Sequence, residues 1–166
     1  MNSYLMFAIL LALALLQSTV MPRITVLDVH PDLLLMAVTS WCLLRGAQEG
    51  MLWALVGGVT TDLFSGARFG VCTLSLLIVS FLSSLGQSNI FRFDVLIPIM
   101  VIPLATLLYS GIMLALLSVL GWPVDWAQSL TRLVFPSMLV NTLGMPVVYL
   151  LMRTLDRRTG REEIAW

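Results

Sequence analysis

Long apolar runs recur along the whole chain, and each closes on a proline, a glycine or a charged residue. Several of these runs approach the roughly 20 residues that a helix needs to cross about 30 Å of hydrocarbon. Because a backbone in lipid must satisfy its own hydrogen bonds, helices are the expected form of such runs. Charged residues make up only 11% of the chain, too few to coat a water-facing surface. The sequence therefore predicts an all-α integral membrane protein.

Six transmembrane helices are expected, in a single helical domain over residues 1–166 that forms one compact bundle. The second apolar run is short for a full crossing, so we expect it to be inclined, shielded by neighbours, or extended back to Pro31. The predicted helices cover residues 4–20, 33–44, 51–64, 69–86, 94–120 and 130–153, and residues 154–166 form a charged tail.

The arginines predict how these helices are oriented, since cytoplasmic loops of membrane proteins carry an excess of basic residues. Six crossings place both termini on the same side of the membrane. With the termini inside, the inner loops and tail hold twice as many arginines as the outer loops, so we predict that both termini are cytoplasmic. The inner set is Arg45, Arg92, Arg153, Arg157, Arg158 and Arg161, and the outer set is Arg23, Arg68 and Arg132.

Several classes of function are not supported by any motif in this sequence. The net charge is zero, and no basic patch suggests nucleic acid as a partner. Neither a phosphate-binding glycine loop nor a hydrolase or zinc-protease motif occurs. The single histidine, His30, lies between Asp28 and Asp32, but we interpret this trio as a solvated loop, because no second histidine or cysteine pair supports a metal site. We expect no enzyme activity, no cofactor and no bound metal.

The densest unusual stretch in the chain is glycine-rich and covers residues 57–70. Gly57 and Gly58 remove bulk from a predicted helix, which in lipid permits another helix to approach closely. Gly66 and Gly70 follow at the point where the chain must turn. We therefore predict a tight helical hairpin here.

An acidic residue, Asp62, lies about one turn before the end of the helix that precedes this turn. A carboxylate is poorly placed there with respect to the helix dipole, so a compensating partner is expected, and Arg68 is the nearest candidate. Two interpretations stay open at this point. The Asp62 and Arg68 pair pins two helices together, or the unit grips a partner or a ligand directly.

Two further features suggest contacts with other proteins. Ala8 and Ala12 form a small-x-x-x-small pair on the first predicted helix, a pattern that can seat another helix. Arg45 closes the second apolar run on the predicted cytoplasmic side and is a candidate anchor there.

The order of these motifs resembles a known bacterial family, the rod shape-determining protein MreD. The resemblance rests on Pro-Asp-Leu-Leu-Leu at 31–35, on Trp-Cys-Leu-Leu-Arg-Gly at 41–46, and on Gly50. It continues through Gly-Gly-Val-Thr-Thr-Asp-Leu-Phe-Ser-Gly at 57–66, followed by Gly70. It covers residues 31–82 well and the rest by length and hydropathy.

The resemblance implies a non-catalytic subunit of the cell-elongation machinery in the bacterial inner membrane. Such a subunit works as a scaffold or adaptor beside MreC in rod-shape determination and peptidoglycan synthesis. Through MreC the family is linked to a RodA-type glycosyltransferase, to a class B penicillin-binding protein and, indirectly, to MreB filaments.

The family is also similar in fold to the six-helix S components of energy-coupling-factor transporters. An S component that binds a vitamin or a metal is therefore the alternative interpretation. Ala8 and Ala12 would then resemble the patch that docks the coupling subunit. The predicted outer loops offer few residues that could enclose a polar ligand, which counts against this alternative.

Overall fold

The computed structural model describes residues 3–19, 29–65, 69–85 and 96–158, and every element within them is helical. A short α6 (Trp126–Ser129) and a π-helical segment (Leu130–Val134) continue directly into α7 (Phe135–Arg158), so these three elements make one helix. The described residues therefore form an all-α fold of six helices. The others are α1 (Ser3–Thr19), α2 (Leu33–Arg45), α3 (Ala47–Ser65), α4 (Val71–Leu85) and α5 (Leu96–Val119).

Two helices begin earlier than their hydropathy predicts. Gly46 has φ 90°, a left-handed conformation that lets α2 turn directly into α3, so α3 begins at Ala47 rather than at residue 51. The last helix begins at Trp126 rather than at residue 130, because Asp125 caps it by accepting a hydrogen bond from the Gln128 backbone N–H. That helix continues to at least Arg158, past the predicted end at residue 153. Charged residues beyond an apolar run thus still continue a helix.

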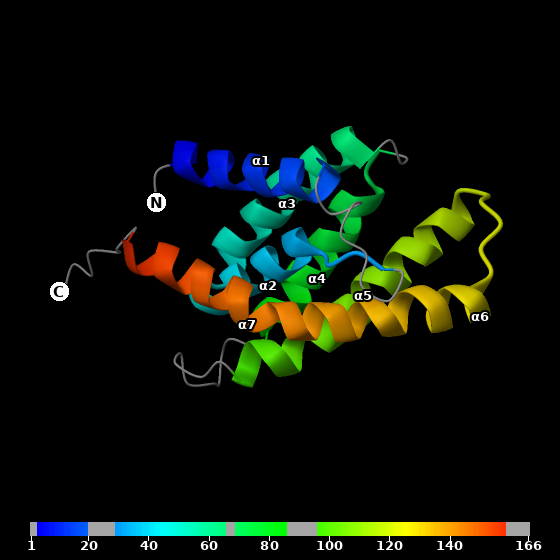
Figure 1. Ribbon diagram of the computed structural model, residues 1–166. Helices are drawn as coiled ribbons and strands as arrows, with labels where there is room; N and C mark the ends of the chain where they lie inside the picture. Colours follow the sequence, from blue (N-terminus) through cyan, green and yellow to red (C-terminus); the bar gives the residue numbers. More distant parts are fainter. Residues whose placement is uncertain (1–2, 20–28, 66–68, 86–95, 159–166) are drawn as a thin grey trace.

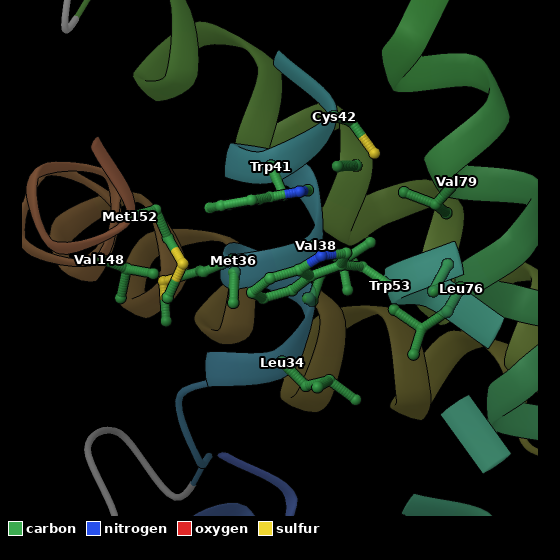
Figure 2. Packing of buried hydrophobic residues seen from close by; sticks show 14 of the residues in the cluster. Leu34, Met36, Val38, Trp41, Cys42, Trp53, Leu76, Val79, Val148 and Met152 are labelled. Atoms are coloured by element: carbon green, nitrogen blue, oxygen red, sulfur yellow. The ribbon is translucent and has the colours of Figure 1, made fainter. Parts of the chain in front are cut away.

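Helix α2 is the centre of the molecule. It contacts α1, α3, α4, α5 and α7, and all its residues from Leu34 to Cys42 are buried. Figure 2 shows its side chains between those of α7, such as Met152, and those of α3 and α4, such as Trp53 and Leu76. A helix of 13 residues is about 20 Å long. Burial on all sides explains how so short an apolar helix is accommodated.

Two helices, α5 and the combined α6–α7 helix, are longer than the others and extend past them at one end of the molecule (Figure 1). Helix α1 begins and α7 ends on the same side, while α5 and the α6–α7 helix extend past the others on the opposite side (Figure 1). The α6–α7 helix has 33 residues, or about 50 Å at 1.5 Å per residue. Among the described helices, α5 and α6–α7 alone are both long enough and apolar enough to cross a membrane.

The outer surface of the bundle is apolar. In α4 the exposed side chains are Leu74, Ile78, Phe81 and Leu82, whereas Thr73 and the four serines of this helix that the structure describes lie buried. This arrangement, with polar groups inside and large apolar groups outside, reverses the pattern of a helix on a water-soluble protein. It fits a molecule whose solvent is lipid.

Candidate functional site

The glycine pair of α3 lies where three other helices pack. A Cβ atom on Gly58 would lie 2.5 Å from the Thr73 Cα atom of α4, closer than side-chain atoms approach a backbone. A Cβ atom on Gly57 would lie 3.0 Å from a methyl group of Leu34 in α2 and 3.4 Å from one of Leu10 in α1. The absence of a side chain at Gly58 therefore sets the distance between α3 and α4, and at Gly57 it leaves room for the side chains of Leu34 and Leu10.

The carboxylate of Asp62 caps the following helix. Its Oδ2 atom accepts hydrogen bonds from the backbone N–H groups of Gly70 and Thr73, each at 3.0 Å, and from the Thr73 hydroxyl. Its Oδ1 atom accepts one from the Cys72 N–H at 3.0 Å. The Cys72 and Thr73 amides belong to the first turn of α4 and Gly70 directly precedes it, so the carboxylate lies at the helix end where the dipole favours a negative charge. Although Asp62 is only 3% exposed, its carboxylate oxygens accept four hydrogen bonds.

The rest of the predicted hairpin motif is partly described. Gly70 has φ +99°, a backbone conformation that favours glycine, and this geometry directs its N–H at Asp62. Gly66 and Arg68 lie outside the described residues, and with them the predicted ion pair between Asp62 and Arg68. The described hydrogen-bond donors to Asp62 are all neutral groups of α4 and of the turn before it. They are the compensating partners that we expected for a carboxylate near the end of a helix.

A second polar cluster fixes the N-terminal end of α2. The Asp32 backbone N–H donates to Asn141 of α7 at 2.9 Å, and the Asp32 carboxylate caps α2 through the Leu35 N–H. Gln17 of α1 donates to Asp32 and accepts from the Leu33 N–H. Asn141 in turn donates to Thr106 of α5 at 3.2 Å. Four helices are thereby joined at one level.

Our sequence reasoning missed Gln17, Thr106 and Asn141 as members of this cluster. For Gln17 and Asn141 a signal was available, because an amide side chain inside an apolar run is costly unless it is hydrogen-bonded. The sequence does not show which of these isolated polar residues lie at the same depth.

The C-terminal end of α2 is held by Arg45, the predicted anchor. Its guanidinium pairs with Asp156 of α7 at 2.5 Å and with Glu49 of α3 at 3.2 Å. It also lies 4.9 Å from the ring centroid of Trp41. The described contacts of Arg45 thus join α2, α3 and α7 within this chain.

Two further predicted features lie on the surface. Ala8 and Ala12 are exposed, while Leu10 and Ala14 of the same helix are buried, so the small pair faces away from the bundle. His30 is exposed next to the half-buried Asp32. Within the described parts of the chain, no group of three or more His, Cys, Asp and Glu side chains could hold a metal ion.

These features define a class of protein. The polar clusters around Asp62, Asn141 and Arg45 join helices to one another, and most of the described serine and threonine hydroxyls bond to the backbone of their own helix. The outer surface is formed by large apolar side chains on α3, α4, α5 and α7. The molecule is an all-helical membrane protein whose described polar contacts are structural ones.

The comparison with protein families identifies which membrane protein family this is. The family model described as rod shape-determining protein MreD matches residues 1–158, nearly the whole chain. The chain therefore belongs to the MreD family, and the resemblance stated from the motifs is confirmed. It is a membrane protein of the rod-shape system, and the family is a shape-determining structural one rather than one known for enzymes. The family does not favour the transporter alternative. No curated protein and no solved structure matches the chain.

Proposed function

We propose that this protein is a non-catalytic scaffold or adaptor that works beside MreC in the cell-elongation complex of the bacterial inner membrane. The observation behind the proposal is that the charged groups Asp62 and Arg45 bond to other helices of the same bundle. Asp62 is bonded to the start of α4, and Arg45 is paired with α3 and α7. A molecule built in this way acts through the shape of its surface, which suits the shape-determining family to which it belongs.

We propose the same architecture that the sequence predicted, with six membrane crossings, both termini in the cytoplasm and a fold like that of transporter S components. Helix α1 begins on the side where α7 ends (Figure 1), as an even number of crossings requires. The charged residues Arg45, Glu49, Arg153 and Asp156 gather on that side. This supports a cytoplasmic location for that end.

The partner surface is proposed to include Ala8 and Ala12 of α1. Both side chains are exposed and small, and in lipid such positions let a second helix approach closely. Partners proposed on the basis of the family are MreC, a RodA-type glycosyltransferase and a class B penicillin-binding protein, with an indirect link to MreB filaments.

For the hairpin we propose that Gly57, Gly58, Asp62 and Gly70 hold the bundle in the shape that partners recognise. Gly66 and Arg68 are proposed as the remaining members of this unit. Arg45 is proposed to anchor the cytoplasmic end of the molecule by fixing α7 against α2 and α3.

The test is a pull-down of the tagged full-length protein from native membranes in a mild detergent, with mass spectrometry of the proteins recovered. We expect MreC together with the synthase pair. An Ala8→Leu, Ala12→Leu variant should recover less MreC, because large side chains would hold a partner helix away. The matched control is Leu143→Ala, a change on the exposed face of α7.

Recovery of a coupling subunit with two ATPases instead of MreC would overturn the scaffold proposal. Undiminished MreC recovery by the double variant would overturn the role of α1 but not the scaffold itself.

A further inference from the structure

The turn that joins α5 to α6 lies where these two helices extend past the others (Figure 1). Gly121, at φ 84°, ends α5, and the Trp122 N–H donates to the Leu117 carbonyl at 3.1 Å, a hydrogen bond typical of a helix C-cap. On the other side of the turn, Asp125 caps α6 through the Gln128 N–H. Both helices that meet at this turn are therefore capped, and the turn has a defined backbone.

This capped turn presents two tryptophans. Trp122 and Trp126 are 56% and 44% exposed, although both are large and mostly apolar. Tryptophan collects at the level of lipid headgroups, where its ring meets apolar groups and its N–H meets polar ones. The exposure of two indoles on one turn indicates a contact outside this chain.

The helix that follows the turn begins with an apolar and a polar side. Trp126 and Leu130 are four positions apart and lie on one side. Gln128 and Arg132 are also four positions apart, and they lie on the opposite side because positions two apart in a helix differ by about 200°. All four residues are exposed. An exposed helix with these two sides is typical of the boundary between lipid and water.

The same helix indicates where the hydrocarbon begins and ends. From Leu133 to Leu151 every exposed side chain is apolar, and these 18 positions correspond to about 27 Å, close to the roughly 30 Å of a bilayer's hydrocarbon region. Charged residues flank this stretch at Arg132 and Arg153. From Trp126 to Arg153 is 27 positions, or about 40 Å, which matches the roughly 40–45 Å of a bilayer with its headgroups.

We propose that residues 120–132, the α5–α6 tip, dock in the headgroup layer of the membrane. The exposed indole N–H groups of Trp122 and Trp126 and the Arg132 guanidinium donate hydrogen bonds to phosphate and ester oxygens of the lipids. The formal charges of Asp125 and Arg132 cancel, so the tip binds zwitterionic phospholipids and does not require anionic ones.

The test measures the depth of single tryptophans in the full-length protein, reconstituted into phosphatidylcholine vesicles. The background variant replaces Trp122, Trp126 and Trp166 with Phe. It keeps the stacked, fully buried pair Trp41 and Trp53 as a reference that lipid does not reach.

Two reporters are compared in this background. One restores the natural Trp126. The matched reporter is Leu143→Trp, at an 80% exposed position near the middle of the apolar stretch of α7. If Leu143→Trp does not fold, Leu139→Trp on the same exposed face takes its place.

The measurement is fluorescence quenching by phosphatidylcholines that carry bromine either near the headgroup or near the end of the acyl chain. We expect the shallow bromine to quench Trp126 on the order of twofold more than the deep bromine does, and the reporter at position 143 to show the reverse order. Stronger quenching of Trp126 by the deep bromine would overturn the proposal. So would quenching of Trp126 by iodide in water but by neither lipid, because the tip would then lie in water.

The contribution of Arg132 is tested in the Trp126 reporter. Arg132→Leu removes the charge that ends the apolar stretch, so the quenching of Trp126 should shift toward the deep bromine. Arg132→Lys keeps the charge and is the matched control, which should leave the ratio unchanged. An unchanged ratio in Arg132→Leu would overturn the contact between Arg132 and the headgroups. Because the purified protein needs no partner for these measurements, their outcome is independent of the pull-down that tests the scaffold.

Discussion

Replacing Asp62 by Ala should cost about 2–4 kcal/mol of unfolding free energy. The carboxylate accepts three backbone hydrogen bonds, from Gly70, Cys72 and Thr73, and one from the Thr73 hydroxyl. Losing a helix cap costs roughly 1 kcal/mol, and side-chain hydrogen bonds in membrane proteins average about 0.6 kcal/mol. Three bonds beyond the cap add about 2 kcal/mol at that average, and more if bonds to a charged group are stronger.

A series of variants separates the contributions at this position. Asp62→Asn keeps one acceptor oxygen but loses the charge that the α4 dipole favours, so we expect about half of the effect. Thr73→Val removes one hydrogen bond from the four and should cost about 0.5–1 kcal/mol. The matched control is Asp125→Ala, since Asp125 also caps a helix but is exposed and accepts one hydrogen bond, at 3.2 Å. Its effect should be much smaller.

The assay is reversible unfolding of the purified protein in mixed micelles, followed by far-ultraviolet circular dichroism. About 3 kcal/mol corresponds to a more than hundredfold shift in the unfolding constant at fixed denaturant. An Asp62→Ala variant as stable as the unaltered protein, or one no weaker than Asp125→Ala, would refute the claim that this carboxylate holds α3 and α4 together.

The remaining predictions use the same assay. Gly58→Ala should destabilise the protein by about 1–3 kcal/mol because its methyl group would meet the Thr73 backbone, whereas Gly111→Ala, with nothing within 4 Å, should be neutral or gain up to about 1 kcal/mol of helix propensity. Loss of stability in both variants would contradict this explanation. A double-mutant cycle of Arg45→Ala and Asp156→Ala should show a coupling energy of about 1 kcal/mol, and additive effects would mean that the ion pair does not join α7 to α2.

Much of this fold follows from local features of the sequence. The apolar runs predict helices, and the bulk missing at Gly57 and Gly58 predicts a close contact. The position of Asp62 near a helix end predicts a compensating partner. Each of these inferences depends on residues near one another in the chain.

The contacts between polar residues of separate helices could not be predicted from the sequence, because they depend on the depth of each residue within the bundle. Gln17, Asp32, Thr106 and Asn141 come from four separate stretches, and they meet because the helices carrying them align at one level. Hydropathy gives the length of each run but not its offset from the next. For the same reason the burial of α2 on all sides was not predictable, although its short length suggested shielding by neighbours.

The positions of the polar contacts bear on how changes in this protein would affect the cell. Described hydrogen bonds and ion pairs fix both ends of α2 and the start of α4. Ala8 and Ala12, by contrast, face outward and are not part of the packed bundle. Substitutions at Gly58 or Asp62 should therefore lower the amount of folded protein and weaken every interaction together. Substitutions on the outer face of α1 should leave the amount unchanged and weaken one interaction. Measuring protein abundance beside complex recovery separates the two groups, so a change in cell shape can be traced either to the bundle or to a partner surface.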